Sequence, residues 1–175
     1  VLDDFSEAGF QIGAKWMDLF KLKNSWVMLE FNNAVPYLYS HSRENLLQSY
    51  SHSNQELAHP LGASFNEFIA MLHFEKGRYF ATVKYFTAAK KREGGGLYGE
   101  NIFLPNDDVI IAMESEKLKW NYYGGEVGYN LNAKTKMQLF AHMFVRSESS
   151  TLRDQSEWFW QFGYRTSLSN FYYEQ

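Results

Sequence analysis

Three features of this sequence predict an all-β fold, an antiparallel transmembrane β-barrel. Apolar and polar residues alternate with a period of two, aromatic residues are abundant in a polar composition, and short connectors alternate with long ones. Of the 175 residues 18% are aromatic, yet 21% are charged and the mean hydropathy is −0.43. Such aromatic content excludes disorder. No stretch approaches the roughly 20 apolar residues of a membrane-spanning helix, whereas a membrane-spanning strand needs only about 10 alternating residues.

The alternation is clearest near the C-terminal end of the chain. There one parity holds Trp158, Trp160, Phe162 and Tyr164, and the other includes Arg165. Such a strand has one aromatic face and one polar face. Six further segments alternate in the same way, so about seven strands are expected. The predicted strands are 9–17, 26–33, 65–74, 78–90, 123–131, 136–146 and 156–168.

The connectors between these segments alternate in length. Short ones are expected around 20–24, 76–78 and 132–135, and long ones at 35–63, 89–116 and 147–156. Outer-membrane barrels have short periplasmic turns and long extracellular loops, so this pattern predicts a C-terminus in the periplasm. For the segment Asn106–Ser115 the pattern leaves three predictions open: an additional strand, a hairpin within the long loop, or part of a longer strand.

An odd number of strands does not close a bacterial single-chain barrel, which has an even number. The chain also begins at Val1 without a signal peptide, which suggests a processed chain or a fragment. We therefore expect residues 1–175 to form the C-terminal part of one larger outer-membrane barrel domain, with upstream strands absent from this chain or supplied by another one.

A soluble up-and-down barrel of lipocalin type is the main alternative, because alternation does not tell which face points inward. Two observations favour the membrane. The polar parity carries charges that would be costly in a dry core but suit a wet lumen: Lys15, Glu30, Lys84, Glu126 and Arg165. Aromatic residues suited to the membrane interface lie on the apolar parity: Trp16, Tyr79, Tyr129, Trp158, Trp160 and Tyr164.

Three passages carry a family resemblance: SHSNQELAHPLGASF within the long loop 36–67, LYGENIFL at 97–104, and the closing WFWQFGYRTSLSNFYY at 158–173. Together they resemble the C-terminal third of Bacteroidetes outer-membrane proteins of the capsule assembly Wzi family, which includes the gliding motility protein RemB. The resemblance implies a large barrel in the outer membrane of a Gram-negative bacterium. It also implies a role in exopolysaccharide (capsule) assembly or attachment, or in gliding motility.

Sugar contact is one reading of the first long loop. Rings beside amides suit a pyranose, whose apolar face packs on an aromatic ring while its hydroxyls bond to polar groups. The alternative is that these rings only pack the loop over the barrel mouth. The candidate glycan contacts are Tyr37, Tyr39, Tyr50, His52, Asn54 and Gln55.

Catalysis and metal binding are not expected. His41, His52 and His59 share one loop without the tight spacing of a metal site, and the His59-Pro60 step is expected to fix the bend where the loop enters the next strand. For a hydrolase, His142 has no marked serine partner such as Ser147. With no cysteine, the chain has no disulfide and no thiolate ligand.

We thus expect a non-enzymatic protein without cofactor or metal. Expected partners are outer-membrane lipid and lipopolysaccharide, surface polysaccharide, the barrel insertion machinery during biogenesis, and other outer-membrane proteins. The cationic run 90–92 is a candidate contact to lipopolysaccharide or an acidic capsule. Nucleic acid is not expected, because the net charge of −3 has no basic field. Alternative functions are a structural subunit or client barrel in a larger outer-membrane complex, and a solute pore.

Overall fold

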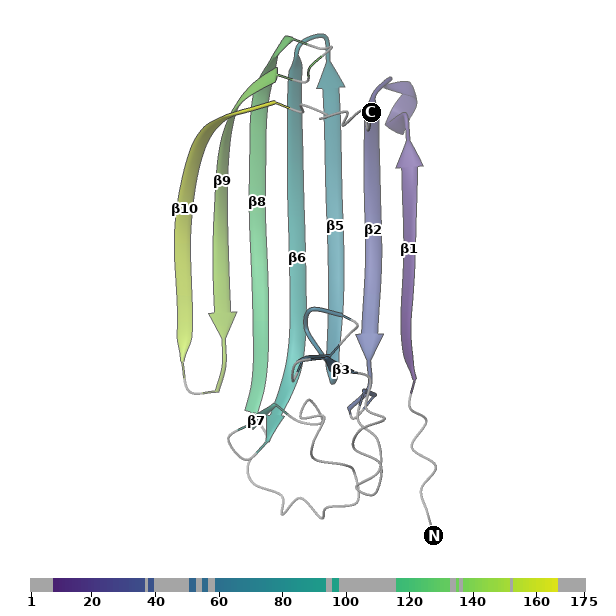
Figure 1. Ribbon diagram of the computed structural model, residues 1–175, viewed down its shortest axis with the longest axis vertical. Helices are drawn as coiled ribbons and strands as arrows, with labels where there is room; N and C mark the ends of the chain where they lie inside the picture. The colour runs from purple at the N-terminus through teal and green to yellow at the C-terminus, as the bar shows by residue number, and fades with distance from the viewer. Residues whose placement is uncertain are drawn as a thin grey trace, which may run out of the picture.

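The computed structural model describes residues 8–36, 38–39, 51–52, 55–56, 59–93, 96–97, 116–132, 135, 137–151 and 153–166. Its architecture is a single curved layer of long antiparallel strands (Figure 1). The strand order in the sheet is β1-β2-β5-β6-β8-β9-β10. The long strands are β1 (Gly9–Met17), β2 (Ser25–Ala34), β5 (Phe65–Lys76), β6 (Tyr79–Glu93), β8 (Glu116–Asn132), β9 (Met137–Ser149) and β10 (Asp154–Arg165).

Short elements accompany the sheet. A 3-10 turn, η1 (Leu19–Lys21), follows β1, the strand β7 (Gly96–Leu97) pairs with β6, and β3 (Ser51–His52) pairs with β4 (Gln55–Glu56) in a separate two-stranded sheet. No helix in the described part of the chain has the length and hydrophobicity to span a membrane. The all-β, antiparallel prediction is therefore confirmed as seven long strands in one open sheet.

Neighbouring strands in the chain are neighbours in the sheet, which is the arrangement that tight turns favour. Between β5 and β6 the chain turns through two residues, Gly77 and Arg78, and Gly77 has a φ of 63°. A type II′ hairpin requires a positive φ at its first central position, and glycine adopts a positive φ without a steric cost. The connector is thus shorter than the sequence pattern predicts.

Two predicted boundaries are wrong because hydrogen-bonded ladders continue past the apolar pattern. The predicted long loop at 147–156 is a four-residue connection, because Ser149 pairs with Asp154 in the β9-β10 ladder. Likewise β8 begins at Glu116 rather than near Tyr123. Backbone groups pair whether or not the side chains are apolar, so hydrophobicity marks the buried or lipid-facing length of a strand and not its ends.

The two long connections, after β2 and β6, lie at the same end of the sheet, together with the four-residue connection after β9 (Figure 1). The turns after β1, β5 and β8 form one end, which we call the turn end, and the connections after β2, β6 and β9 form the other, the loop end. The candidate strand Asn106–Ser115 lies outside the described residues.

Candidate functional site: the two faces of the sheet

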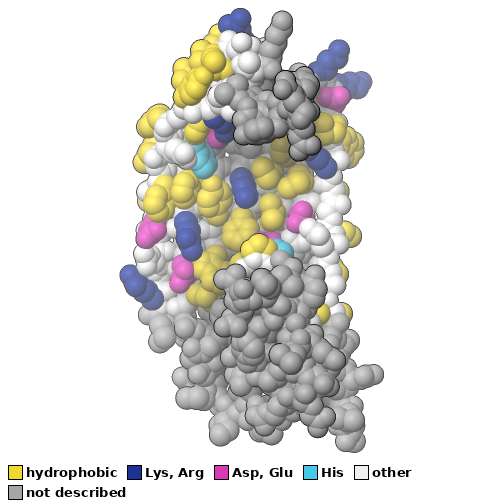
Figure 2. Space-filling model, viewed as in Figure 1, with side chains coloured by type: hydrophobic (Ala, Val, Ile, Leu, Met, Phe, Trp, Pro, Cys, Tyr) yellow, Lys and Arg dark blue, Asp and Glu magenta, His cyan; other side chains and the backbone are white. Residues whose placement is uncertain are grey.

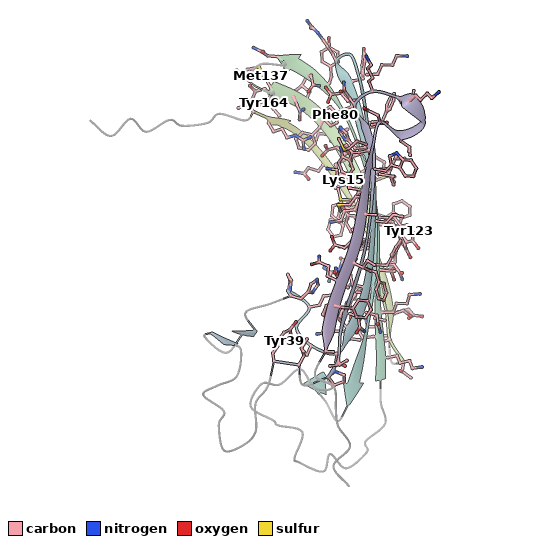
Figure 3. The ribbon with its side chains drawn as sticks, turned by 90° about the vertical axis from the view of Figure 1, so that its right-hand side faces the viewer. Lys15, Tyr39, Phe80, Tyr123, Met137 and Tyr164 are labelled. Atoms are coloured by element: carbon pink, nitrogen blue, oxygen red, sulfur yellow. The ribbon has the colours of Figure 1, made fainter. Side chains whose placement is uncertain are left out.

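The registers bring the apolar parity of every strand onto one face, the outer face. Trp16, for example, continues in one row through Val27, Leu72, Val83, Gly125 and Met143 to Trp160. Strand pairing therefore joins seven separately predicted faces into one, with Tyr123 on this side of the sheet and Lys15 on the other (Figure 3).

Large hydrophobic side chains of the outer face are exposed, with accessible fractions from 38% for Met143 to 76% for Phe162. They occur on all seven long strands. Soluble monomers rarely expose a contiguous apolar patch of this kind, and such patches are typical of surfaces that contact another protein or a membrane. The exposed side chains are Phe10, Ile12, Trp16, Leu29, Leu72, Tyr79, Val83, Tyr123, Val127, Leu131, Leu139, Met143, Trp158, Trp160, Phe162 and Tyr164.

Aromatic residues bound the outer apolar band at both ends, at a constant spacing. On five strands two outward aromatic residues lie six positions apart, which corresponds to about 20 Å along a strand. Rings also meet across strands: Tyr85 lies 5.0 Å from Tyr123, and Tyr79 lies 5.1 Å from Tyr129, between centroids. The bounding pairs are Phe10 and Trp16, Phe68 and Phe74, Tyr79 and Tyr85, Tyr123 and Tyr129, and Trp158 and Tyr164.

The band runs obliquely to the strands. In strict register Trp16 is level with Trp160, but the turn-end aromatic residue of β10 is Tyr164, four positions further toward the turn end. An apolar band between two parallel planes shows this offset when the strands are tilted against the planes, as barrel strands are.

Of the six aromatic residues predicted for a membrane interface, most lie near strand ends. Trp16 and Tyr164 are next to last in β1 and β10, and Tyr79 begins β6. Tyr129 pairs with Tyr79, and Trp158 is the loop-end ring of β10. In contrast, Trp160 lies in the middle of β10. Whether these rings meet a membrane interface stays a prediction.

The inner face is concave and mixes charged groups with rings (Figure 2). Near the turn end, aromatic and glycine residues alternate in one row, Phe80, Gly128, Phe140 and Gly163. The Phe80 ring packs against Gly128, where an added Cβ would be 2.2 Å from the ring. The Phe140 ring packs in the same way against Gly163, where an added Cβ would be 2.5 Å from the ring. Close ring-to-backbone packing of this kind goes with the bend of the sheet over its inner face at the turn end (Figure 3).

Arg165 joins the edge strand β10 to β8 across the intervening strand. Its guanidinium donates two hydrogen bonds to Glu126, of 2.6 and 3.1 Å, and a third of 2.7 Å to Gln138. The same guanidinium lies 4.7 Å from the Phe140 ring and 5.3 Å from the Phe80 ring. The two predicted inward charges thus form a bidentate ion pair between rings, which holds Arg165 in one orientation.

A second inner cluster lies nearer the middle of β8, β9 and β10. The Phe144 ring stacks between Tyr122 and Phe159, at 5.2 and 4.7 Å between centroids, and the Tyr122 hydroxyl is 3.3 Å from Nε2 of His142. Ser147, by contrast, shares the outer face with Val145, so His142 has no serine partner there. Within the described ranges, no three His, Asp or Glu side chains lie together in a way that holds a metal ion.

At the loop end a polar network attaches the first long connection to the sheet. His59 Nε2 lies 3.0 Å from the buried carboxylate of Glu67, and the His59 ring stacks on Phe65 at 4.4 Å. Asn32 Nδ2 donates to both Glu67 and Glu30, at 2.6 and 2.8 Å. His59 also accepts hydrogen bonds from the backbone N–H groups of Leu61, on Nδ1, and Gly62, on its carbonyl oxygen, which is consistent with the predicted bend before the strand.

The candidate glycan residues are only partly described. Tyr37, Tyr50 and Asn54 lie outside the described residues, and His52 pairs with Gln55 between β3 and β4. Tyr39 lines an open cavity of about 640 Å³ together with amide and ring side chains from the sheet. Its other lining residues include Gln11, Asn32, Asn33, His59 and Phe65, all of which the glycan prediction missed. Of the polar residues among these, only Gln11 and Asn32 lie on the polar parity that the sequence shows.

No family model, no curated protein and no solved structure matches this chain. The class that the fold and its two faces define is therefore an antiparallel β-sheet protein with one exposed apolar face and one polar face.

Proposed function

We propose that this sheet is part of a β-barrel in the outer membrane of a Gram-negative bacterium, with the turn end in the periplasm and the loops outside. The exposed apolar outer face, bounded by aromatic residues at a constant spacing, carries this proposal. Outer-membrane barrels present an apolar band about 25 Å tall between aromatic girdles and a polar lumen. A soluble barrel with the same curvature would instead leave the rings of the outer face in water and enclose the charges of the inner face in its core.

Strands beyond the two edges complete such a barrel. In the described sheet β1 and β10 are the edge strands, each paired on one side only. Unpaired backbone groups cost several kcal/mol each in lipid, so a membrane sheet closes on itself. The proposal accordingly includes further strands between β10 and β1, in the same chain or in another.

The role that we propose for the barrel is non-enzymatic: attachment or assembly of surface polysaccharide, or of a gliding complex, as in the Wzi and RemB proteins that the sequence resembles. The resemblance supports this choice, and the cavity beside Tyr39 supplies the rings and amides that sugar contact needs. Retention of surface polysaccharide by the purified protein tests it. A Tyr37→Ala/Tyr39→Ala/Tyr50→Ala variant should retain less, and equal retention would contradict the loop assignment.

Tryptophan fluorescence tests the membrane proposal directly. Trp16, Trp158 and Trp160 point outward, whereas Trp26 and Trp120 lie on inner-face rows. In vesicles of brominated lipid, single-tryptophan variants that retain an outward residue should be quenched, and variants that retain Trp26 or Trp120 should not. Equal quenching of both sets, or a full-length protein that stays monomeric in water without detergent, would overturn the proposal.

A further inference from the structure

Beyond the apolar band, near its loop end, the sheet has a hollow of about 410 Å³ that is lined by an outer-face row and the adjacent inner-face row. Four side chains in one register row floor it, Asn33, Asn66, Ala89 and Lys119. Ala89 lies between Asn66 and Lys119, and because its side chain is a single methyl group it leaves space between the longer ones. The small side chain of Ala89 therefore contributes to the depth of the hollow.

The lining of this hollow is cationic. Lys117 and Lys119 line it from the outer face of β8, Lys90 is buried on the adjacent inner-face row, and none of the lining residues is acidic. Lys117 and Lys119 are exposed, and neither forms an ion pair with another described residue. A site with several lysines and no carboxylate selects an anion.

Amide groups on the opposite wall add hydrogen-bond donors. Asn33 Nδ2 donates to Asn66 Oδ1 at 2.7 Å, so the Nδ2 group of Asn66 is oriented away from Asn33. That group donates to no other described residue. Together with the lysine ammonium groups it offers the convergent donors that a phosphoryl group accepts.

Relative to the aromatic boundary, the hollow begins at the height of a lipid headgroup and extends further outward. Asn66 lies two positions beyond Phe68, and Lys119 lies four beyond Tyr123, which corresponds to about 7 and 13 Å along the strands. Headgroups occupy roughly the first 5 to 8 Å beyond the hydrocarbon, and tilt shortens the vertical distance. Lysine side chains can bend back toward this layer.

We propose that this hollow binds a phosphate group of lipid A in the outer leaflet. The inference rests on the proposed outer-membrane location and specifies which residues contact the lipid. Lys117 and Lys119 bind the phosphate oxygens, and the Asn66 amide donates a hydrogen bond from the other wall.

Native mass spectrometry of the full-length protein in detergent micelles tests this site with lipid A that carries its phosphates and with dephosphorylated lipid A. The wild-type protein should retain the phosphorylated lipid preferentially. A Lys117→Gln/Lys119→Gln variant should bind it more weakly by a factor on the order of ten. The matched control, Lys23→Gln/Lys76→Gln, removes two exposed lysines at the turn end and should bind as the wild type does.

Equal retention by wild type and the Lys117→Gln/Lys119→Gln variant, or equal retention of both lipids, would overturn the site. A third arm uses a phosphate-free acidic polysaccharide as the probe. If it binds more tightly than lipid A and depends on the same lysines, the hollow belongs to a polysaccharide and the lipid assignment is wrong. Tryptophan quenching in brominated lipid distinguishes these outcomes from failure of the membrane proposal, because an inserted barrel is quenched whether or not it binds lipid A.

Discussion

Gly128 lies on the inner face of β8, directly beneath an aromatic ring. An added Cβ there would be 2.2 Å from the Phe80 ring and 2.7 Å from the backbone oxygen of Leu139. The ring could rotate away, but the carbonyl belongs to the neighbouring strand and is fixed by the ladder. Glycine is therefore required at this position for packing, in a strand where it would otherwise reduce stability.

We predict that Gly128→Ala lowers the free energy of unfolding by about 1–3 kcal/mol, because the methyl group displaces Phe80 and strains the β8-β9 ladder. Gly125→Ala is the matched control: this glycine lies on the same strand but faces outward, and its Cβ would meet nothing within 4 Å. Denaturant titration of the protein in lipid vesicles measures both. Equal losses for the two variants would show that packing against Phe80 is not the reason for glycine at Gly128.

At the scale of the element, β10 shows how one strand serves two environments. Phe162 points outward and is 76% exposed, while its neighbour Gln161 shares the inner row of His142. Successive side chains of a strand lie on opposite faces, so two substitutions at adjacent positions test the apolar outer face and the polar inner face separately.

We predict that Phe162→Lys costs about 2–4 kcal/mol of unfolding free energy in a bilayer, because a lysine on the lipid face near the middle of the membrane is poorly solvated. Gln161→Lys should change stability little, since its side chain faces a polar surface. Urea or guanidinium titration in vesicles of phosphatidylcholine compares the two. If Phe162→Lys is tolerated as well as Gln161→Lys, the outer face of β10 does not contact lipid.

At the scale of the whole molecule, the constant six-residue spacing of the bounding aromatic residues sets the thickness of the apolar band. About 20 Å along tilted strands is shorter than the 30 Å hydrocarbon core of a typical bilayer. The bacterial outer membrane is thinner than an average bilayer. Each Å of difference between the apolar band and the hydrocarbon core costs a fraction of a kcal/mol.

We therefore predict that the protein is more stable in bilayers of short-chain lipids than in thick ones. The outward row Thr87, Asn121, Ser147 and Ser156 is polar and lies just beyond the loop-end aromatic boundary. Replacing these four residues by Leu extends the apolar band on β6, β8, β9 and β10 by one row. The bilayer thickness at which the protein is most stable should therefore increase. Unfolding free energies across a series of acyl-chain lengths measure both effects, and an unchanged optimum in the variant would contradict this reading of the band.

The sequence by itself determined which side chains share a face of each strand, because alternation is a property of neighbouring residues and needs no knowledge of pairing. The outward sets around Trp16, Leu72 and Trp160 were predicted in this way, and the registers place them on one face. Strand ends were less predictable. The ladders beyond Tyr123 and around Ser149 are held by backbone hydrogen bonds, which leave no trace in hydrophobicity.

Only the tertiary structure decided which residues of different strands meet. The Arg165-Glu126 ion pair joins positions 39 apart in the chain, and the hollow beside Ala89 depends on Asn66 and Lys119 being level in the sheet. The physical reason is register: local pattern fixes the face of a side chain, whereas its neighbours across the sheet follow from the hydrogen-bonded alignment of strands that are distant in sequence.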